Sequence, residues 1–167
     1  MTITVLRNIS GGQTGVDRAA LDAAQAAGLQ CGGFCPKGRA AEDGPIHDRY
    51  PLSETAAIDP AVRTRANIES ADATLILVMD DDRRGWGPGT RLTEQHAQHL
   101  SRAVHLTVLG DGINGRPPIL EALEETQAWI VGHGVRALNV AGPRESTSPG
   151  IYQHAHAFLT RLFAASS

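Results

Sequence analysis

Hydrophobic and polar residues follow two alternating patterns along the chain. Short runs of apolar, often β-branched residues predict strands at residues 3–9, 29–35, 73–79, 104–109 and 135–140. Longer stretches that mix apolar and polar residues lie between these runs and after the last one, and they predict helices at residues 16–27, 60–71, 90–102, 119–131 and 151–164. Because strand-like and helix-like segments take turns, the pattern predicts an α/β fold in three layers, with a mainly parallel sheet of about five strands and helices on both faces.

Length, composition and charge narrow the class of protein. A chain of 167 residues, 41% of them hydrophobic and 20% charged, predicts a single folded domain over residues 1–167. The net charge of -3 argues against nucleic acid as the main partner. The longest apolar run, residues 73–79, is too short to cross a bilayer, and residues 1–10 contain no signal-peptide core. We therefore expect a cytoplasmic protein with no membrane partner.

The chain shows no clear set of metal ligands. Cys31 and Cys35 have three residues between them rather than the two of a zinc-binding pair, so two reduced thiols are expected. His96 and His99 share one helix face, but no third ligand accompanies them, which favours a polar helix surface. The sequence predicts no metal site.

A glycine-rich turn joins the first predicted strand to the first predicted helix. Glycines let the backbone approach a ligand closely, and the helix N-terminus offers free N–H groups to an anion. The turn lacks the G-x-G-x-x-G spacing of dinucleotide-binding folds and the Lys-Ser/Thr pair of a P-loop, and a tight turn without a ligand is the alternative. The candidate ligand-binding residues here are Ser10, Gly11, Gly12, Gln13, Thr14 and Gly15.

The second predicted strand ends in basic residues, where a dinucleotide-binding fold has an acidic reader of the ribose. Lys37 and Arg39 stand there, and both favour a phosphate. Lys37 is also the single lysine beside fourteen arginines. Codon usage explains why lysine is rare but not where this one lies, so we expect it to serve as a point charge toward phosphate. Residues 36–58 show no clear periodicity and are a candidate lid.

A second glycine-rich turn precedes the third predicted helix. Placed beside the first turn, it would let two helix N-termini face one ligand. The aspartates at residues 80–82 suit Mg²⁺ or ribose hydroxyls, but a solvated loop end balanced by Arg83 and Arg84 is favoured. The candidate ligand-binding residues of this turn are Gly87, Gly89, Thr90 and Thr93.

The loop after the fifth predicted strand contains small residues, hydroxyls and one arginine. Arg144 and Ser146 are candidates to close over a phosphate. A polar turn before the last helix would have the same composition, so both interpretations stay open.

Four motifs carry a resemblance to a known family. They read SGGQTGVDR at residues 10–18, CPKGR at 35–39, GTRLT at 89–93 and AGPRES at 141–146. With them the chain resembles, over nearly its whole length, the circularly permuted YpsA family of the SLOG superfamily, also labelled molybdenum carrier proteins. The resemblance implies a Rossmann-like domain that binds a nucleotide or nucleotide-derived phosphorylated ligand at the carboxyl ends of the strands, as a sensor or processor.

An alternative function is hydrolysis of an N-glycosidic bond, because the superfamily includes phosphoribohydrolases. That reaction needs a carboxylate to stabilise an oxocarbenium-like state, and Asp17 and Glu94 are the catalytic candidates. The related hydrolases resemble P-G-G-x-G-T-x-x-E, whereas Glu94 comes one residue late here. One residue turns a helical side chain by about 100°, so Glu94 is expected to face away from the position of that acid.

The motifs do not identify one cofactor. A nucleotide-derived ligand is the main expectation, and a molybdenum species is not excluded because two anion-binding helix starts would also accept an oxyanion. We also expect a homo-oligomer, formed through an exposed apolar helix face that involves Trp129 or Phe158.

Overall fold

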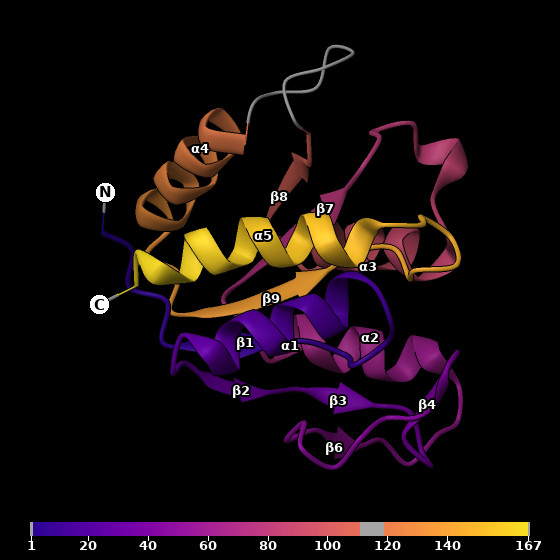
Figure 1. The fold of residues 1–167 in the computed structure, drawn as a ribbon. Coiled ribbons are helices and arrows are strands. Elements are labelled where there is room, and N and C mark those ends of the chain that lie inside the picture. Colours follow the sequence, from indigo (N-terminus) through magenta and orange to yellow (C-terminus); the bar gives the residue numbers. More distant parts are fainter. Residues whose placement is uncertain (1, 111–118, 167) are drawn as a thin grey trace.

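The computed structural model describes residues 2–110 and 119–166. Its main sheet has five parallel strands in the order β2-β1-β9-β7-β8 (Figure 1). These strands are β1 (Arg7–Ile9), β2 (Gln30–Gly32), β7 (Ala73–Val78), β8 (Ala103–Val108) and β9 (Ala137–Ala141). The helices are α1 (Val16–Ala26), α2 (Pro60–Glu69), α3 (Pro88–His99), α4 (Ile119–Gly132) and α5 (Ile151–Ala164), with a short 3-10 turn, η1 (Arg83–Gly85). The α/β fold with a five-strand parallel sheet is confirmed.

Helices cover both faces of this sheet. Helices α1, α4 and α5 pack on one face and α2 and α3 on the other (Figure 1). The side of α1 that meets α5 is built from small alanines, which lets the two helices lie close together. Phe158 and Phe163 of α5 are fully buried in the core between the helices and the sheet. The expectation that Phe158 lies on an exposed oligomer face is therefore wrong, while Trp129 is half-buried against His105.

The strand expected at residues 29–35 is split in two. Gly33 has φ 135°, and a Cβ there would lie 2.2 Å from the carbonyl oxygen of Ser10, so the chain turns away from the main sheet. The next residues form β3 (Phe34–Cys35), which pairs in parallel with β6 (Ser53–Glu54). Asn67 of α2 accepts the N–H of Phe34 at 2.7 Å and donates to its carbonyl at 3.0 Å. This side chain fixes β3 outside the five-strand sheet.

Residues 36–58 are packed despite their lack of periodicity. They contain a hairpin of β4 (Ala40–Ala41) and β5 (Gly44–Pro45) as well as β6. A small apolar cluster with α1 holds them in place, formed by Leu21, Cys35, Ile46, Tyr50 and Leu52. The guanidinium of Arg39 donates to four backbone carbonyls, those of Ile46, His47, Tyr50 and Leu52, at 2.9–3.1 Å. The segment therefore has a fixed conformation of its own.

The first predicted strand is shorter than expected. Only Arg7–Ile9 joins the sheet, while Ile3 makes an isolated parallel bridge to Ser166 and brings the two ends of the chain together. Ile3 and Val5 are nevertheless fully buried, which explains their apolar character in the sequence. Among the described residues, no helix combines the length and the apolar composition needed to cross a membrane.

Candidate functional site

A cavity of about 60 Å³ lies at the carboxyl ends of the central strands. It sits between β1 and β7, where β9 is inserted and where the chain runs outward to β2 on one side and to β8 on the other. This is the topological switch point at which open α/β sheets bind their ligands. The lining residues are Gly11, Gln13, Asp17, Arg63, Thr64, Asn67, Gly87, Gly89, Thr90, Thr93, residues 139–144 and Thr147.

The wall next to α1 is formed by a buried ion pair. Asp17, in the first turn of α1, accepts a hydrogen bond from Nη1 of Arg63 at 2.8 Å, and the side chains are 9% and 11% exposed. The same carboxylate accepts the backbone N–H of Gln13 at 3.2 Å. Gly11 leaves room for the pair, because a Cβ there would lie 1.6 Å from Nη1 of Arg63. Glycine is therefore required at this position for Arg63 to reach the turn.

The opposite wall is the start of α3. Gly87 precedes the helix, Pro88 is its first residue, and Thr90 and Thr93 lie buried in its first turns. The hydroxyl of Thr93 donates to the carbonyl of Gly89 at 2.9 Å. The side chain of Arg144, after β9, is 42% exposed. The cavity is thus bordered by two glycine-rich turns and two arginines.

Two buried polar atoms of lining residues lack partners. Among the described residues, Nε of Arg63 and Oδ1 of Asn139 are buried and make no hydrogen bond. The amide nitrogen of Asn139 donates to Thr74 at 3.2 Å, so only its oxygen is left. Buried polar groups without partners are uncommon in folded proteins and mark strained or functional positions.

The structure brings together half of the predicted ligand-binding residues. Those that line the cavity are Gly11, Gln13, Gly87, Gly89, Thr90, Thr93 and Arg144. Ser10 lies beneath it, fully buried, with its hydroxyl shared between the carbonyls of Asp17 and Val140. Gly12 packs against Ile46 and Leu52 instead.

Thr14 and Gly15 line a separate, wider cavity of about 350 Å³ beside Tyr50 and Tyr152. Lys37 and Arg39 do not reach the lining of the smaller cavity. Lys37 is exposed, and its backbone N–H donates to the carbonyl of Ala57 at 3.0 Å. The guanidinium of Arg39 donates its hydrogen bonds to backbone carbonyls of its own segment.

The two catalytic candidates occupy different places. Asp17 lines the cavity, whereas Glu94 lies outside the lining and forms a bidentate ion pair with Arg83, with the shortest contact at 2.7 Å. Across the described residues, no group of three or more His, Cys, Asp or Glu side chains is arranged to hold a metal ion.

Sequence reasoning missed the contribution of α2. Arg63, Thr64 and Asn67 line the cavity, yet none of them was assigned to a ligand. The detectable signal was the i, i+4 spacing of Arg63 and Asn67, which places two polar side chains on one face of a helix that also packs on the sheet. Asn139 and Val140, at the end of β9, also line the cavity and were not predicted, because nothing in a single sequence separates them from the rest of a buried strand.

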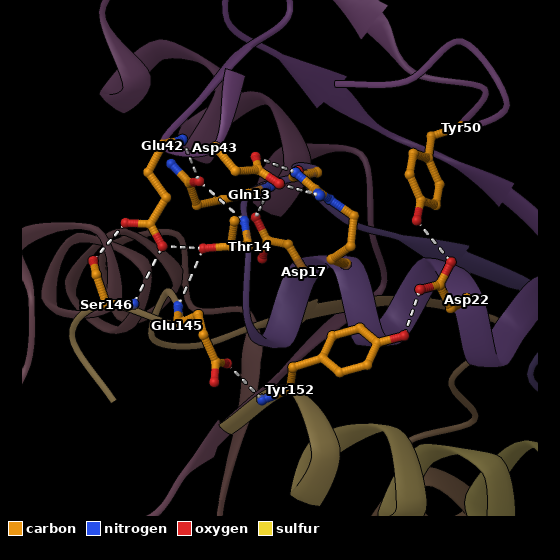
Figure 2. Close-up of polar contacts among 12 residues, drawn as sticks. Gln13, Thr14, Asp17, Asp22, Glu42, Asp43, Tyr50, Glu145, Ser146 and Tyr152 are labelled. Atoms are coloured by element: carbon orange, nitrogen blue, oxygen red, sulfur yellow. Dashed lines mark hydrogen bonds and ion pairs between the residues drawn. The ribbon is translucent and has the colours of Figure 1, made fainter. Parts of the chain in front are cut away.

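Beside the cavity, the tip of the β4-β5 hairpin reaches the loops after β1 and β9 (Figure 2). The carboxylate of Glu42 accepts hydrogen bonds from the hydroxyls of Ser146 and Thr14 and from the backbone N–H of Ser146. These bonds hold the pKa of Glu42 below its ordinary value. The neighbouring Asp43 is paired with Arg18 at 2.9 and 3.0 Å, which likewise lowers the pKa of its carboxyl group.

A family model described as the circularly permutated YpsA SLOG family matches residues 8–163. The chain belongs to this family. The matched range contains every residue that lines the cavity. The resemblance in the four motifs is therefore confirmed across the whole YpsA-type domain.

A solved structure supports the same assignment. The crystal structure of a putative molybdenum carrier protein from Syntrophus aciditrophicus SB, at 1.45 Å resolution, has 36% sequence identity to this YpsA-family chain and a TM-score of 0.87. The match covers 98% of this chain and 97% of that one. A comparison with curated proteins finds no match.

Proposed function

We propose that the protein binds a nucleotide or a nucleotide-derived phosphorylated ligand in the cavity at the carboxyl ends of the strands, as a sensor or processor. The observation that carries this proposal is the convergence of the α1 turn, the start of α3 and the guanidinium groups of Arg63 and Arg144 on one cavity. Helix starts and arginine forks are the groups that proteins use to hold phosphate. Because Gln13, Thr14 and Val16 use their N–H groups within the protein, the donors here are the start of α3 and the two arginines. Membership in the SLOG superfamily supports a small-molecule ligand.

The size of the cavity supports a phosphate as the group that enters it. A buried water needs about 10–15 Å³ of such space, so a cavity of about 60 Å³ admits a group of a few heavy atoms. The remainder of a nucleotide would extend outward past Arg144, which is partly exposed at the rim. The buried Nε of Arg63 and Oδ1 of Asn139 offer one donor and one acceptor for polar groups of the ligand.

Thermal-shift titration tests the proposal. The panel is AMP, ADP, ADP-ribose, NAD and NADP, and a ligand at a hundred times its Kd stabilises the folded chain by about 2.7 kcal/mol. For a domain of this size we expect the melting temperature to rise by about 5–10 °C. Arg144→Ala is expected to remove most of the shift. Arg91→Ala serves as the matched control, because Arg91 is an exposed arginine near the start of α3 that does not line the cavity. Absence of stabilisation by every compound would count against nucleotide binding.

A second candidate function is hydrolysis of an N-glycosidic bond, and the position of Asp17 is the observation that favours it. Asp17 is a buried carboxylate in the cavity wall, where it could stabilise an oxocarbenium-like state next to a bound phosphate. Release of free base from a nucleoside monophosphate by the parent protein, lost in a still folded Asp17→Asn but kept in Glu94→Gln, would support it. Absence of base release by the parent protein would count against hydrolysis.

Molybdate belongs in the same ligand panel, because the solved relative is named as a putative molybdenum carrier protein. Molybdate is a tetrahedral oxyanion and would use the N–H and guanidinium donors proposed for phosphate. If molybdate stabilises the protein and AMP does not displace it, oxyanion carriage is favoured over nucleotide binding.

A further inference from the structure

The carboxylate of Glu42 is held as a bound anion would be. One oxygen accepts from the hydroxyl of Thr14 and, at 3.2 Å, from the backbone N–H of Ser146. The other oxygen accepts from the hydroxyl of Ser146 and lies 3.9 Å from Nη1 of Arg144. Figure 2 shows this carboxylate between the loop after β1 and the loop after β9.

The groups around this carboxylate come from the two loops that approach the ligand cavity. Gln13 and Arg144 line that cavity and are close neighbours in the chain of Thr14 and Ser146. A backbone N–H, two hydroxyls and a guanidinium group are a donor set suited to a phosphate as well as to a carboxylate. The place that Glu42 occupies is therefore chemically fit for an anionic group of a ligand.

The hairpin does not depend on this carboxylate for its position. Asp43 pairs in bidentate fashion with Arg18, and the backbone N–H of Glu42 donates to Oε1 of Gln13 at 3.0 Å. The side chain of Glu42 is 21% exposed, so solvent and solutes reach it. It can swing out of its place while the hairpin stays attached through Asp43.

We propose that Glu42 is a built-in competitor for an anion subsite formed by Thr14, Arg144 and Ser146, which a phosphate group of the ligand occupies once the Glu42 side chain swings out. The identity of the anion as a nucleotide phosphate rests on the proposed function. The competition itself rests only on the contacts of Glu42. The resident carboxylate lowers the apparent affinity for the ligand to the intrinsic affinity multiplied by the fraction of time that the subsite is free.

Calorimetric titration of the full chain with inorganic phosphate tests the competition directly. If the Glu42 side chain spends about ten times as long inside the subsite as outside it, removing the side chain strengthens phosphate binding about tenfold. We expect this gain in Glu42→Ala, and a smaller gain in Glu42→Gln, which keeps the shape and one acceptor oxygen but loses the charge. Adding Thr14→Val to Glu42→Ala should remove the gain.

Asp43→Asn is the matched control, because it weakens the hairpin attachment to Arg18 without touching the subsite. It is expected to bind phosphate as the parent protein does. Equal phosphate affinity in the parent and in both Glu42 variants, including no binding in any of them, would overturn the proposal. An equal gain in Asp43→Asn and Glu42→Ala would also overturn it, because a loosened hairpin would then explain both.

The nucleotide panel, run on the same variants, separates this inference from the proposed function. A gain for inorganic phosphate with no nucleotide binding in any variant would refute the nucleotide function and leave the competition standing. Nucleotide binding that is the same in the parent and in Glu42→Ala, together with unchanged phosphate binding, would refute the competition and leave the function standing.

Discussion

Tyr50 and Tyr152 donate their hydroxyl protons to the two oxygens of a single carboxylate, Asp22, at 2.8 and 2.6 Å (Figure 2). Asp22 lies on α1, Tyr152 on α5, and Tyr50 in the segment that follows β3. The shared carboxylate therefore ties the irregular segment to both helices. Burial and the hydrogen bond to Asp22 raise the pKa of Tyr152 to about 12, and the same causes raise the pKa of Tyr50.

Alkaline titration should show this arrangement directly, because these are the only two tyrosines of the chain. A tyrosine pKa that is higher in the folded state stabilises the fold below pH 10, and that stabilisation is lost as the pH rises from 10 toward about 12. We expect phenolate absorbance to appear well above pH 10 in the folded protein and near pH 10 in denaturant. Asp22→Asn should lower both folded-state pKa values, and unchanged titration in that variant would contradict the shared-carboxylate account.

Breaking the ion pair between Asp17 and Arg63 should be costly. Both side chains are about nine-tenths buried, so Asp17→Asn leaves a buried guanidinium without its counter-charge. Removing one partner of such a pair costs about 3–5 kcal/mol of unfolding free energy. Urea unfolding measures the loss, and the double variant Asp17→Asn with Arg63→Met should recover part of it. A double variant less stable than either single one would contradict this explanation.

Two glycines with positive φ differ in what an added Cβ would meet. Gly28→Ala, at φ 74° with no atom within 4 Å of the new Cβ, should cost about 1–2 kcal/mol from strain alone. Gly15→Ala, at φ 79°, would also place its Cβ 2.4 Å from the carbonyl oxygen of Pro143. Gly15 also has ψ -128°, a combination that only glycine adopts, so we expect about 2–5 kcal/mol there from strain and overlap together. Equal losses of unfolding free energy in the two variants would contradict this ranking.

Asn67 should control whether β3 keeps its place. Asn67→Ala leaves the N–H and the carbonyl of Phe34 without their partner, at about 1–3 kcal/mol for each group that stays buried. Asn67→Asp should lose at least as much, because it places a buried carboxylate oxygen against the carbonyl of Phe34, where Asn67 has a donor. Hydrogen exchange at the Phe34 amide measures the local effect, and full protection of that amide in Asn67→Ala would contradict this role.

The regular part of the fold was predictable from the sequence because its signals are local. The composition of β7, whose six residues are all buried, predicts a buried strand, and the alanines of α1 predict a closely packed helix. The break at Gly33 was not predictable, because it depends on the Ser10 backbone and on Asn67, which meet Gly33 only in the folded chain.

The candidate site shows the same division. The glycine-rich turns were found because they join a predicted strand to a predicted helix, and the carboxyl ends of parallel strands meet at one edge of a sheet. Arg39 carried the correct charge at the expected strand end, yet its guanidinium is directed to carbonyls of its own segment. Which partner an arginine chooses is set by tertiary contacts, and a single sequence does not contain that information.

The exposed position of Lys37 makes the chain suited to site-specific labelling. Apart from the amino terminus, an amine-reactive dye finds one primary amine, and it lies three residues before the β4-β5 hairpin. Because Lys37 lies outside the lining of the cavity, a dye there need not block the ligand. The presence of a single lysine thus provides a fluorescent reporter position next to the segment that carries Glu42, without any engineered cysteine.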